Sequence, residues 1–313
     1  MPKVKEKSAA ANFFLDPAIA AKLTPLALEP IVAEKPWGAL AHTSFNAPSD
    51  AENLRWGEIW LACEDFGLSS KVASGANRGH ILAWFKINWG LGLVGHRPNP
   101  NLPTLPVSLR LERTGSEPGP VRVLSDDELW YVLEAGTESW VGAGSTSSEA
   151  PWPKRLKKNP VEPGDRFIMP PGLVNSLGPH MTVLKVLPTG SLVGTLYNWE
   201  RPADLWDFTP PPKEIPLVNT EPAPLKPLCE GRDRILYQGP IYDLTLVKTS
   251  FTSAKGEGLS IICPIKGRGR VQVSGSKESL RLHPGQAVLL PAGLSRYSID
   301  SGTLISYLHF KFH

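Results

Sequence analysis

The 313-residue sequence has few cysteines and lacks long apolar runs and a marked excess of charge. Its three cysteines, Cys63, Cys229 and Cys263, form no Cys-x-x-Cys pair and are predicted to be reduced, buried thiols of a cytoplasmic protein. No run of about 18 apolar residues occurs, and the N-terminus has no continuous apolar segment, so neither a membrane span nor a signal peptide is expected. The formal net charge of +3 gives no reason to expect binding to nucleic acid or a membrane surface.

Metal-ligand spacing is also missing among four of the histidines. His80, His96, His180 and His283 do not pair with one another at any such spacing. A lone histidine is more often a hydrogen-bonded structural residue than a metal ligand, so we expect structural roles for these residues.

Proline and glycine are abundant, with 32 and 28 residues spread between short apolar runs. This pattern predicts many strands joined by turns rather than disorder. Two helices are expected in the N-terminal part. One covers residues 16–28 with Asp16 as N-cap, and the other covers residues 79–89 and stops at Gly90. Residues 142–158 are predicted to be a polar loop, whose basic run at 154–158 is exposed to solvent.

Two stretches of the chain follow one template. Residues 163–173 read PGDRFIMPPGL, and residues 284–294 read PGQAVLLPAGL. A turn, a strand and a second turn in the same order predict a β-unit that occurs twice. Such units usually place a metal-binding histidine just after this template, and Asn175 and Arg296 stand at those places.

The fold class predicted from these patterns is all-β dominated, with two tandem cupin (jelly-roll) barrels and a few short helices in the N-terminal part. The predicted domains are an N-terminal extension (1–29), a first cupin domain (30–205), a proline-rich linker (206–233) and a second cupin domain (234–313).

Six segments, in the right order, resemble the type I mannose-6-phosphate isomerases, which are zinc-dependent cupin enzymes. The segments are EKPWG at 34–38, GEIW at 57–60, SKVASG at 70–75, LPVSLRL at 105–111, ELWY at 128–131 and PGDRFIMPPG at 163–172. The resemblance covers about residues 30–313. It implies a zinc site in the first cupin domain and an aldose–ketose isomerase activity on a sugar phosphate.

The same resemblance implies four zinc ligands, of which one remains. Arg122 and Leu124 stand where the family has the glutamine and histidine of a QVHPND stretch, and Asn175 replaces a further histidine. Glu128 is the remnant ligand. A zinc site needs three or four converging donor atoms, whereas Leu124 donates nothing and Arg122 brings a fixed positive charge.

Further family features are replaced. Thr195 stands at the position of the family's catalytic arginine, Pro120 stands at that of a serine linked with phosphate binding, and a loop of roughly twenty residues before Glu128 is missing. No catalytic residue is therefore assigned. The substrate-binding candidates are Arg110, Arg122, Glu128 and Asn175. Arg122 serves either as a donor to an oxyanion or as the cation that neutralises Glu128.

Three functions remain open. The favoured one is a mannose-6-phosphate isomerase-like cupin without metal-dependent isomerase activity, which binds a sugar or sugar phosphate as a sensor or accessory protein and needs no cofactor. The second is an active isomerase of carbohydrate metabolism whose altered zinc site uses Glu128, Asp126, Asp127 and His180. The third is a structural cupin module. The sequence gives no indication of the oligomeric state.

Overall fold

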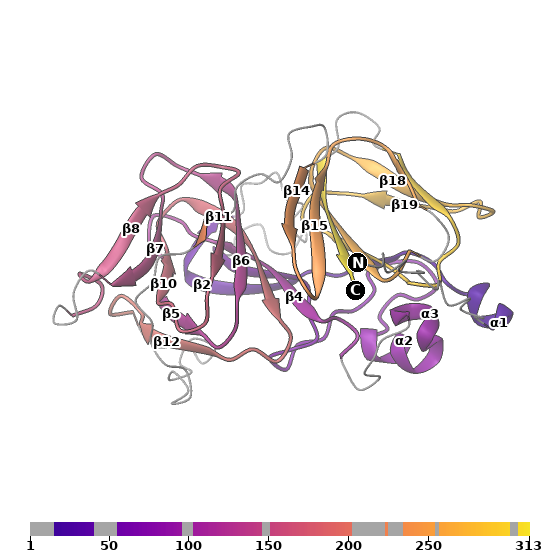
Figure 1. The fold of residues 1–313 in the computed structure, drawn as a ribbon, viewed down its shortest axis with the longest axis horizontal. Helices are drawn as coiled ribbons and strands as arrows, with labels where there is room; N and C mark the ends of the chain where they lie inside the picture. Colours follow the sequence, from indigo (N-terminus) through magenta and orange to yellow (C-terminus); the bar gives the residue numbers. More distant parts are fainter. Residues whose placement is uncertain are drawn as a thin grey trace, which may run out of the picture.

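The computed structural model describes residues 16–40, 55–95, 103–145, 151–201, 223–224, 234–253, 257–300 and 306–313. This part of the chain contains three short helices and 22 strands, which confirms the prediction of a β-dominated fold with a few short helices. The strands form four antiparallel sheets arranged as two lobes side by side, and no sheet of the described residues closes into a barrel (Figure 1). None of the helices described is long and apolar enough to cross a membrane.

The first lobe, called the first unit here, consists of a seven-stranded sheet with the order β13-β9-β6-β11-β4-β3-β2 and a five-stranded sheet with the order β12-β5-β10-β7-β8. The bounds are β2 (Ile31–Leu40), β3 (Arg55–Ala62), β4 (Val107–Arg113), β5 (Val121–Leu124), β6 (Glu128–Ala135), β7 (Trp140–Ser145), β8 (Leu156–Pro160), β9 (Arg166–Met169), β10 (Asn175–Leu177), β11 (Met181–Pro188), β12 (Val193–Tyr197) and β13 (Ala223–Pro224).

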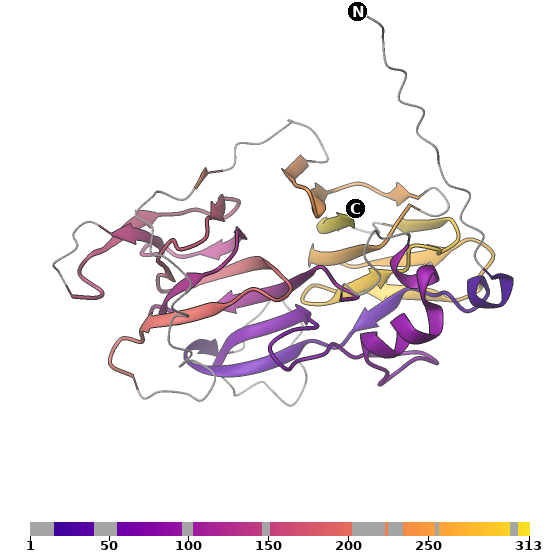
Figure 2. The ribbon, with the colours of Figure 1, turned by 60° about the horizontal axis from the view of Figure 1, so that its bottom comes forward.

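The second unit pairs a six-stranded sheet, β1-β20-β17-β22-β15-β14, with a four-stranded sheet, β16-β21-β18-β19. The bounds are β1 (Leu26–Leu28), β14 (Arg234–Gln238), β15 (Tyr242–Val247), β16 (Phe251–Thr252), β17 (Ser260–Lys266), β18 (Gly269–Val273), β19 (Ser279–Leu282), β20 (Ala287–Leu290), β21 (Tyr297–Asp300) and β22 (Ser306–Phe312). Figure 2 shows that the N-terminal helices lie beside this unit.

The helix predicted over residues 16–28 is wrong beyond its first turn. The helix α1 (Pro17–Ala20) begins where predicted, because the Asp16 side chain accepts a hydrogen bond from the Ala18 amide at 2.8 Å. The later residues instead form β1, which pairs with β20. This pairing with a distant strand overrides the local helical pattern. It also joins part of the predicted N-terminal extension to the second unit.

The second predicted helix is largely confirmed as α2 (Leu82–Trp89), followed by the short α3 (Leu91–Val94). Gly90 separates the two helices with a φ of +48°, a left-handed conformation that favours glycine. The backbone carbonyl of Leu93 accepts a hydrogen bond from the Ala292 amide at 2.9 Å, which attaches this helical segment to the second unit.

The polar loop predicted over residues 142–158 is wrong, because its two ends belong to β7 and β8. Trp140 lies directly over Gly178, where an added Cβ would stand 2.7 Å from the indole ring. Within the basic run, the Arg155 guanidinium stacks 3.8 Å from the Trp152 ring centroid, and Lys158 lies 4.6 Å from that of Trp140. Backbone pairing of β7 with β8 and with β10 makes strands of the two ends of this stretch. The predicted linker lies outside the described residues except for β13.

The repeated template folds alike in both units. Gly164 and Gly285 have φ values of +101° and +80° in the first turn, and β9 and β20 follow. The two template ends differ in what comes next. Asn175 is buried at the start of β10, whereas Arg296 is exposed beside β21. The position after the template therefore faces the interior in the first unit only.

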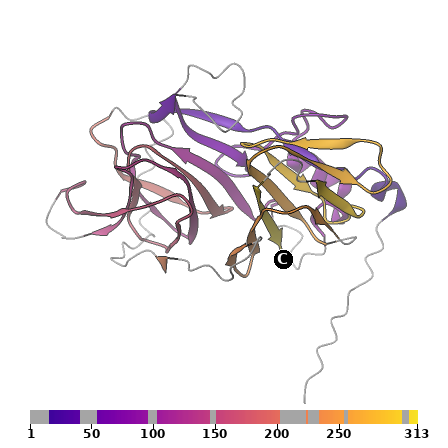
Figure 3. The same ribbon diagram turned by 90° about the horizontal axis from the view of Figure 1, so that it is seen from above.

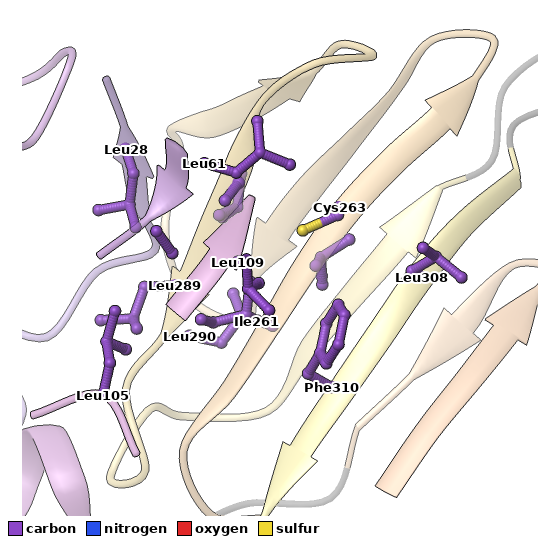
Figure 4. Packing of buried hydrophobic residues seen from close by; sticks show 14 of the residues in the cluster. Leu28, Leu61, Leu105, Leu109, Ile261, Cys263, Leu289, Leu290, Leu308 and Phe310 are labelled. Carbon is purple, nitrogen blue, oxygen red and sulfur yellow. The ribbon is translucent and has the colours of Figure 1, made fainter. Parts of the chain in front are cut away.

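The seven-stranded sheet has two faces of opposite character. One face is apolar and packs against the six-stranded sheet of the second unit, where Leu61 and Leu109 meet Ile261, Leu289 and Phe310 (Figure 4). This shared core joins the two lobes, which also lie in contact when seen from above (Figure 3). Within it, Cys263 is free and buried as predicted, and so is Cys63, while Cys229 lies outside the described residues. The other face of the sheet carries charged side chains.

Candidate functional site

A cluster of buried charged side chains fills the interior of the first unit, between its two sheets. Strand alternation explains their placement, since Arg110 and Glu112 of β4 point to the face opposite Leu109 and Leu111. We call the following seven residues the charge cluster, each between 1% and 6% exposed: Lys35, Glu58, Arg110, Glu112, Arg122, Glu128 and Lys185.

Arg122 links the two sheets. It projects from β5 of the five-stranded sheet, with its Nη2 2.9 Å from Glu58 Oε1 and its Nη1 3.3 Å from Glu112 Oε2. Its guanidinium also lies 5.7 Å from the centroid of the Trp37 ring. Glu58 and Glu112 are direct partners on β3 and β4, so one guanidinium bridges two neighbouring carboxylates.

Arg110 and Lys185 complete the network. Arg110 lies 3.5 Å from Glu58, 3.6 Å from Glu112 and 3.5 Å from Glu128. Lys185, its direct partner on β11, donates to Glu112 at 2.7 Å. A buried charge is stable only when it is paired, and each of the three carboxylates has an arginine within reach.

The pairing keeps Glu58 and Glu112 ionised. Burial alone would raise the pKa of Glu58, but the guanidinium groups of Arg110 and Arg122 outweigh it, so the pKa is lowered. Burial also opposes ionisation of Glu112, yet Lys185 and the same two guanidinium groups hold its pKa at about 2. Burial lowers the pKa of the Lys185 ammonium, against the attraction of the carboxylates. Glu58 and Glu112 are therefore fixed negative charges.

A cavity of about 670 Å³ opens onto this cluster. Aromatic and aliphatic side chains supply much of its lining, and the charged residues that line it are Glu34, Lys35, Glu58, Asp65, Arg110 and Arg122. Two loops border the opening, and they are joined where the Gly190 amide donates to Asp65 Oδ2 at 2.6 Å. A volume of this size matches that of small-molecule sites in proteins, which lie between about 300 and 1,000 Å³.

No family model matches the chain. The mannose-6-phosphate isomerase ManA of Bacillus subtilis (strain 168) is 24% identical over 319 aligned positions, which cover 88% of this chain and 96% of that protein. The chain is a homologue of the type I mannose-6-phosphate isomerases.

Solved structures of mannose-6-phosphate isomerases share the fold. The Bacillus subtilis crystal structure superposes with a TM-score of 0.73 at 19% identity, covering 92% of this chain and 99% of that one. The Salmonella typhimurium structure, bound to its substrate fructose 6-phosphate and to zinc, superposes with a TM-score of 0.68 at 11% identity, covering 92% and 100%.

The structure brings the residues singled out by the isomerase resemblance close together. Arg122 is the direct strand partner of both Asn175 on β10 and Thr195 on β12. Arg110, Arg122 and Thr195 line the cavity. Asn175 is buried, with its side-chain amide donating to the carbonyl of Leu173 at 3.1 Å.

The remnant ligand Glu128 lies at the start of β6, where its Oε2 accepts a hydrogen bond from the Trp130 indole. Leu124 is buried and offers only carbon atoms. The Asn175 Nδ2 donates to the Leu173 carbonyl, so Glu128 and Asn175 Oδ1 are the oxygen donors of this set, and Arg122 and Leu124 add none. Two donor residues are fewer than the three or four that a zinc site needs.

The alternative zinc set is not assembled either. His180 is exposed in the turn between β10 and β11, Asp127 is exposed, and the Asp126 carboxylate accepts from Ser125 at 2.6 Å. Across the residues with a described position, no three His, Cys, Asp or Glu side chains come close enough to hold a metal ion. These four residues therefore do not form one site.

Sequence reasoning missed Lys35, Glu58, Glu112 and Lys185 as members of the site. A signal was present, because charged residues interrupt otherwise apolar strands in GEIWLA, VSLRLER and MTVLKVLP. A charge at an inward position of a buried strand needs a partner of opposite charge, so several such strands together predict a buried ion-pair network.

Proposed function

We propose that this chain uses the fold of the mannose-6-phosphate isomerases to bind a sugar or sugar phosphate, as a sensor or accessory protein, without zinc-dependent isomerisation. The observation that carries this proposal is the Arg122 guanidinium, which lies 2.9 Å from Glu58 and 3.3 Å from Glu112. It places a permanent positive charge inside the first unit, at a position where the isomerase resemblance expects a metal ligand.

The chemistry of isomerisation supports this reading. Moving a proton between adjacent carbons requires a base and an electrophile that stabilises the enediolate, and zinc is an electrophile of this kind. A guanidinium can stabilise an oxyanion when its donors point at that oxygen. Arg122 instead directs both terminal nitrogens at carboxylates.

The cavity supports the binding half of the proposal. It is large enough for a hexose derivative, and Lys35, Arg110 and Arg122 line it with cations. The rings of Trp60 and Phe66, whose centroids are 5.3 Å apart, form an aromatic wall for the apolar face of a sugar. A homologous fold in Salmonella typhimurium holds fructose 6-phosphate.

Metal analysis and ligand binding test the proposal together. Purified protein dialysed against zinc-free buffer should contain far less than one zinc per chain and should not isomerise mannose 6-phosphate. Thermal unfolding should shift upward with a hexose derivative, since a ligand that binds only the folded state stabilises it. An Arg110→Met variant should lose that shift. One retained zinc per chain together with turnover would overturn the proposal.

Two other functions are outcomes of the same experiment. Homology to an isomerase over 96% of its length favours the active enzyme with an altered metal site as second candidate. Turnover that depends on added zinc would support it. Absence of both turnover and any ligand shift would support a structural module. We further propose a cytoplasmic location, in keeping with the free thiols of Cys63 and Cys263.

A further inference from the structure

The Asp65 carboxylate joins the two loops that border the cavity. Its Oδ1 accepts a hydrogen bond from the Phe66 amide at 2.8 Å, and its Oδ2 accepts one from the Gly190 amide at 2.6 Å. Asp65 follows β3, whereas Gly190 lies between β11 and β12, so one side chain connects segments that are 125 residues apart in the sequence. The carboxylate therefore fixes the two loops relative to each other.

Phe66, in the first of these loops, has a backbone conformation that a bulky residue rarely adopts. Its φ is +54°, in the left-handed region that favours glycine. The side chain is half-buried, lines the cavity and tilts against Trp60, but it belongs to none of the hydrophobic core clusters of the described residues. Core packing therefore does not account for the strain, and strain of this kind is concentrated at ligand sites.

Ser191, in the second loop, has an unpaired hydroxyl although its neighbours are bonded. The Thr189 amide donates to the Pro106 carbonyl at 3.0 Å, and the Leu192 amide donates to the Ser125 hydroxyl at 2.8 Å. Ser191 itself is 4% exposed and lines the cavity, yet among the described residues its Oγ has no hydrogen-bond partner. A buried hydroxyl is nearly always paired. A ligand hydroxyl in the cavity would give it a partner after rotation about χ1, which has three staggered positions.

We propose that these two loops recognise the ring of a sugar ligand. The Phe66 side chain contacts an apolar face of the ring, the Ser191 hydroxyl pairs with one ring hydroxyl, and Asp65 is the positioning residue that holds both loops in place. This inference rests on the proposed function and names the part of the ligand that the loops contact.

The division of the cavity lining supports this assignment. The Arg110 guanidinium lies 4.9 Å from the ring centroid of Trp60, and Phe66 lies 5.3 Å from it, so charged and aromatic surfaces adjoin in one cavity. A sugar phosphate has the same two parts. Its ring has apolar C–H faces that pack on aromatic side chains, and its phosphate accepts hydrogen bonds from guanidinium groups.

Ser191→Ala should weaken ligand binding without weakening the fold. Calorimetric titration of the full chain with D-mannose 6-phosphate, D-fructose 6-phosphate and D-mannose identifies the tightest probe, which is then used with the variants. Loss of one hydrogen bond should lower the affinity of Ser191→Ala about threefold or more. The melting temperature of the free variant should stay the same or rise, because an unpaired buried hydroxyl is removed. Ser279→Ala, at an exposed position on β19, is the matched control and should change neither quantity.

Phe66→Ala and Phe66→Gly separate the contribution of the ring from that of the backbone. Both variants remove the ring and should lower the affinity about fivefold or more. Phe66→Gly should melt at a higher temperature than Phe66→Ala, because a φ of +54° suits glycine. Lower affinity in both, with this order of melting temperatures, is the expected result for a strained residue that serves the ligand.

Asp65→Ala and Asp65→Asn separate the hydrogen bonds of Asp65 from its charge. Both variants remove the charge, but asparagine keeps one acceptor oxygen for a loop amide. The affinity should fall about tenfold in Asp65→Ala and by less in Asp65→Asn. Equal effects of the two variants would show that Asp65 acts through its charge, which overturns its positioning role.

The outcomes separate this inference from the proposed function. A probe that binds Ser191→Ala and Phe66→Ala as tightly as the unmodified chain overturns the inference and leaves the proposed function standing. No binding of any of the three probes to the unmodified chain at millimolar concentration, in a protein that melts cooperatively, overturns the proposed function and the inference together.

Discussion

The interiors of the two units differ in charge, although both units contain the same turn–strand–turn template. The first unit buries seven charged side chains between its sheets. Among the described residues of the second unit, the buried polar side chains are Ser253 and Ser260. His309 is held neutral there, because burial and the nearby Lys311 lower its pKa to about 4. The template determines the backbone turns, whereas the side chains at inward-facing strand positions determine the charge of the interior.

The two interiors are connected through one apolar core. The seven-stranded sheet turns its charged face inward and packs its apolar face on the second unit, in a single hydrophobic cluster. Burial of apolar surface contributes about 25 cal/mol per Å², which offsets the desolvation of the charges behind it. The second unit therefore stabilises the sheet that carries the site.

The variant with the largest expected effect on stability removes Arg122, the central cation of the first unit. Arg122→Met leaves Glu58 and Glu112 with less compensation, and we expect the free energy of unfolding to fall by about 3–5 kcal/mol. Urea unfolding followed by fluorescence measures it. Arg281→Met, at an exposed position on β19, is the matched control and should change stability by less than about 0.5 kcal/mol. Equal effects of both variants would show that the network contributes nothing.

What the sequence predicted well was local. The two templates located β9 and β20, and Asp16 located the start of α1. Distant pairing decided the rest, since residues 26–28 became β1 only through contact with β20. The site followed the same rule. Arg122 was found from a motif, but its partner Glu58 lies 64 residues away, and no local pattern joins them.

A second variant asks whether the network stabilises the fold or serves the site. Arg122→Met combined with Glu58→Met removes the cation together with its closest carboxylate, so less uncompensated charge is left than in the single variant. We expect the double variant to recover about 2 kcal/mol or more of the stability lost in Arg122→Met, since apolar groups replace buried ion pairs at little loss. The same unfolding assay measures the recovery. An additive loss would mean that Arg122 and Glu58 act independently.

A third prediction uses the neutral histidine of the second unit. The folded pKa of His309 lies at about 4, below its ordinary 6.5, so the unfolded chain takes up a proton first as the pH falls. The stability tied to neutral His309 is therefore complete above pH 6.5 and falls between pH 6.5 and 4. Between pH 7 and pH 5, the unmodified protein should lose roughly 2 kcal/mol of its free energy of unfolding through protonation of His309 in the unfolded chain, and His309→Leu should lack this loss. A His309→Leu variant that kept the wild-type pH dependence would contradict the assignment.

The smallest expected effect belongs to an ion pair on the surface of the second unit. Arg270 on β18 and Asp300 on β21 lie 3.3 Å apart, as close as Arg122 and Glu112, but their side chains are 61% and 53% exposed. Water screens both charges, so Arg270→Met should change the free energy of unfolding by less than about 1 kcal/mol. This change should be smaller still at high salt, because salt screens the pair further. Urea unfolding at low and at high salt measures this. A loss as large as that of Arg122→Met would show that distance alone, and not burial, sets the strength of these pairs.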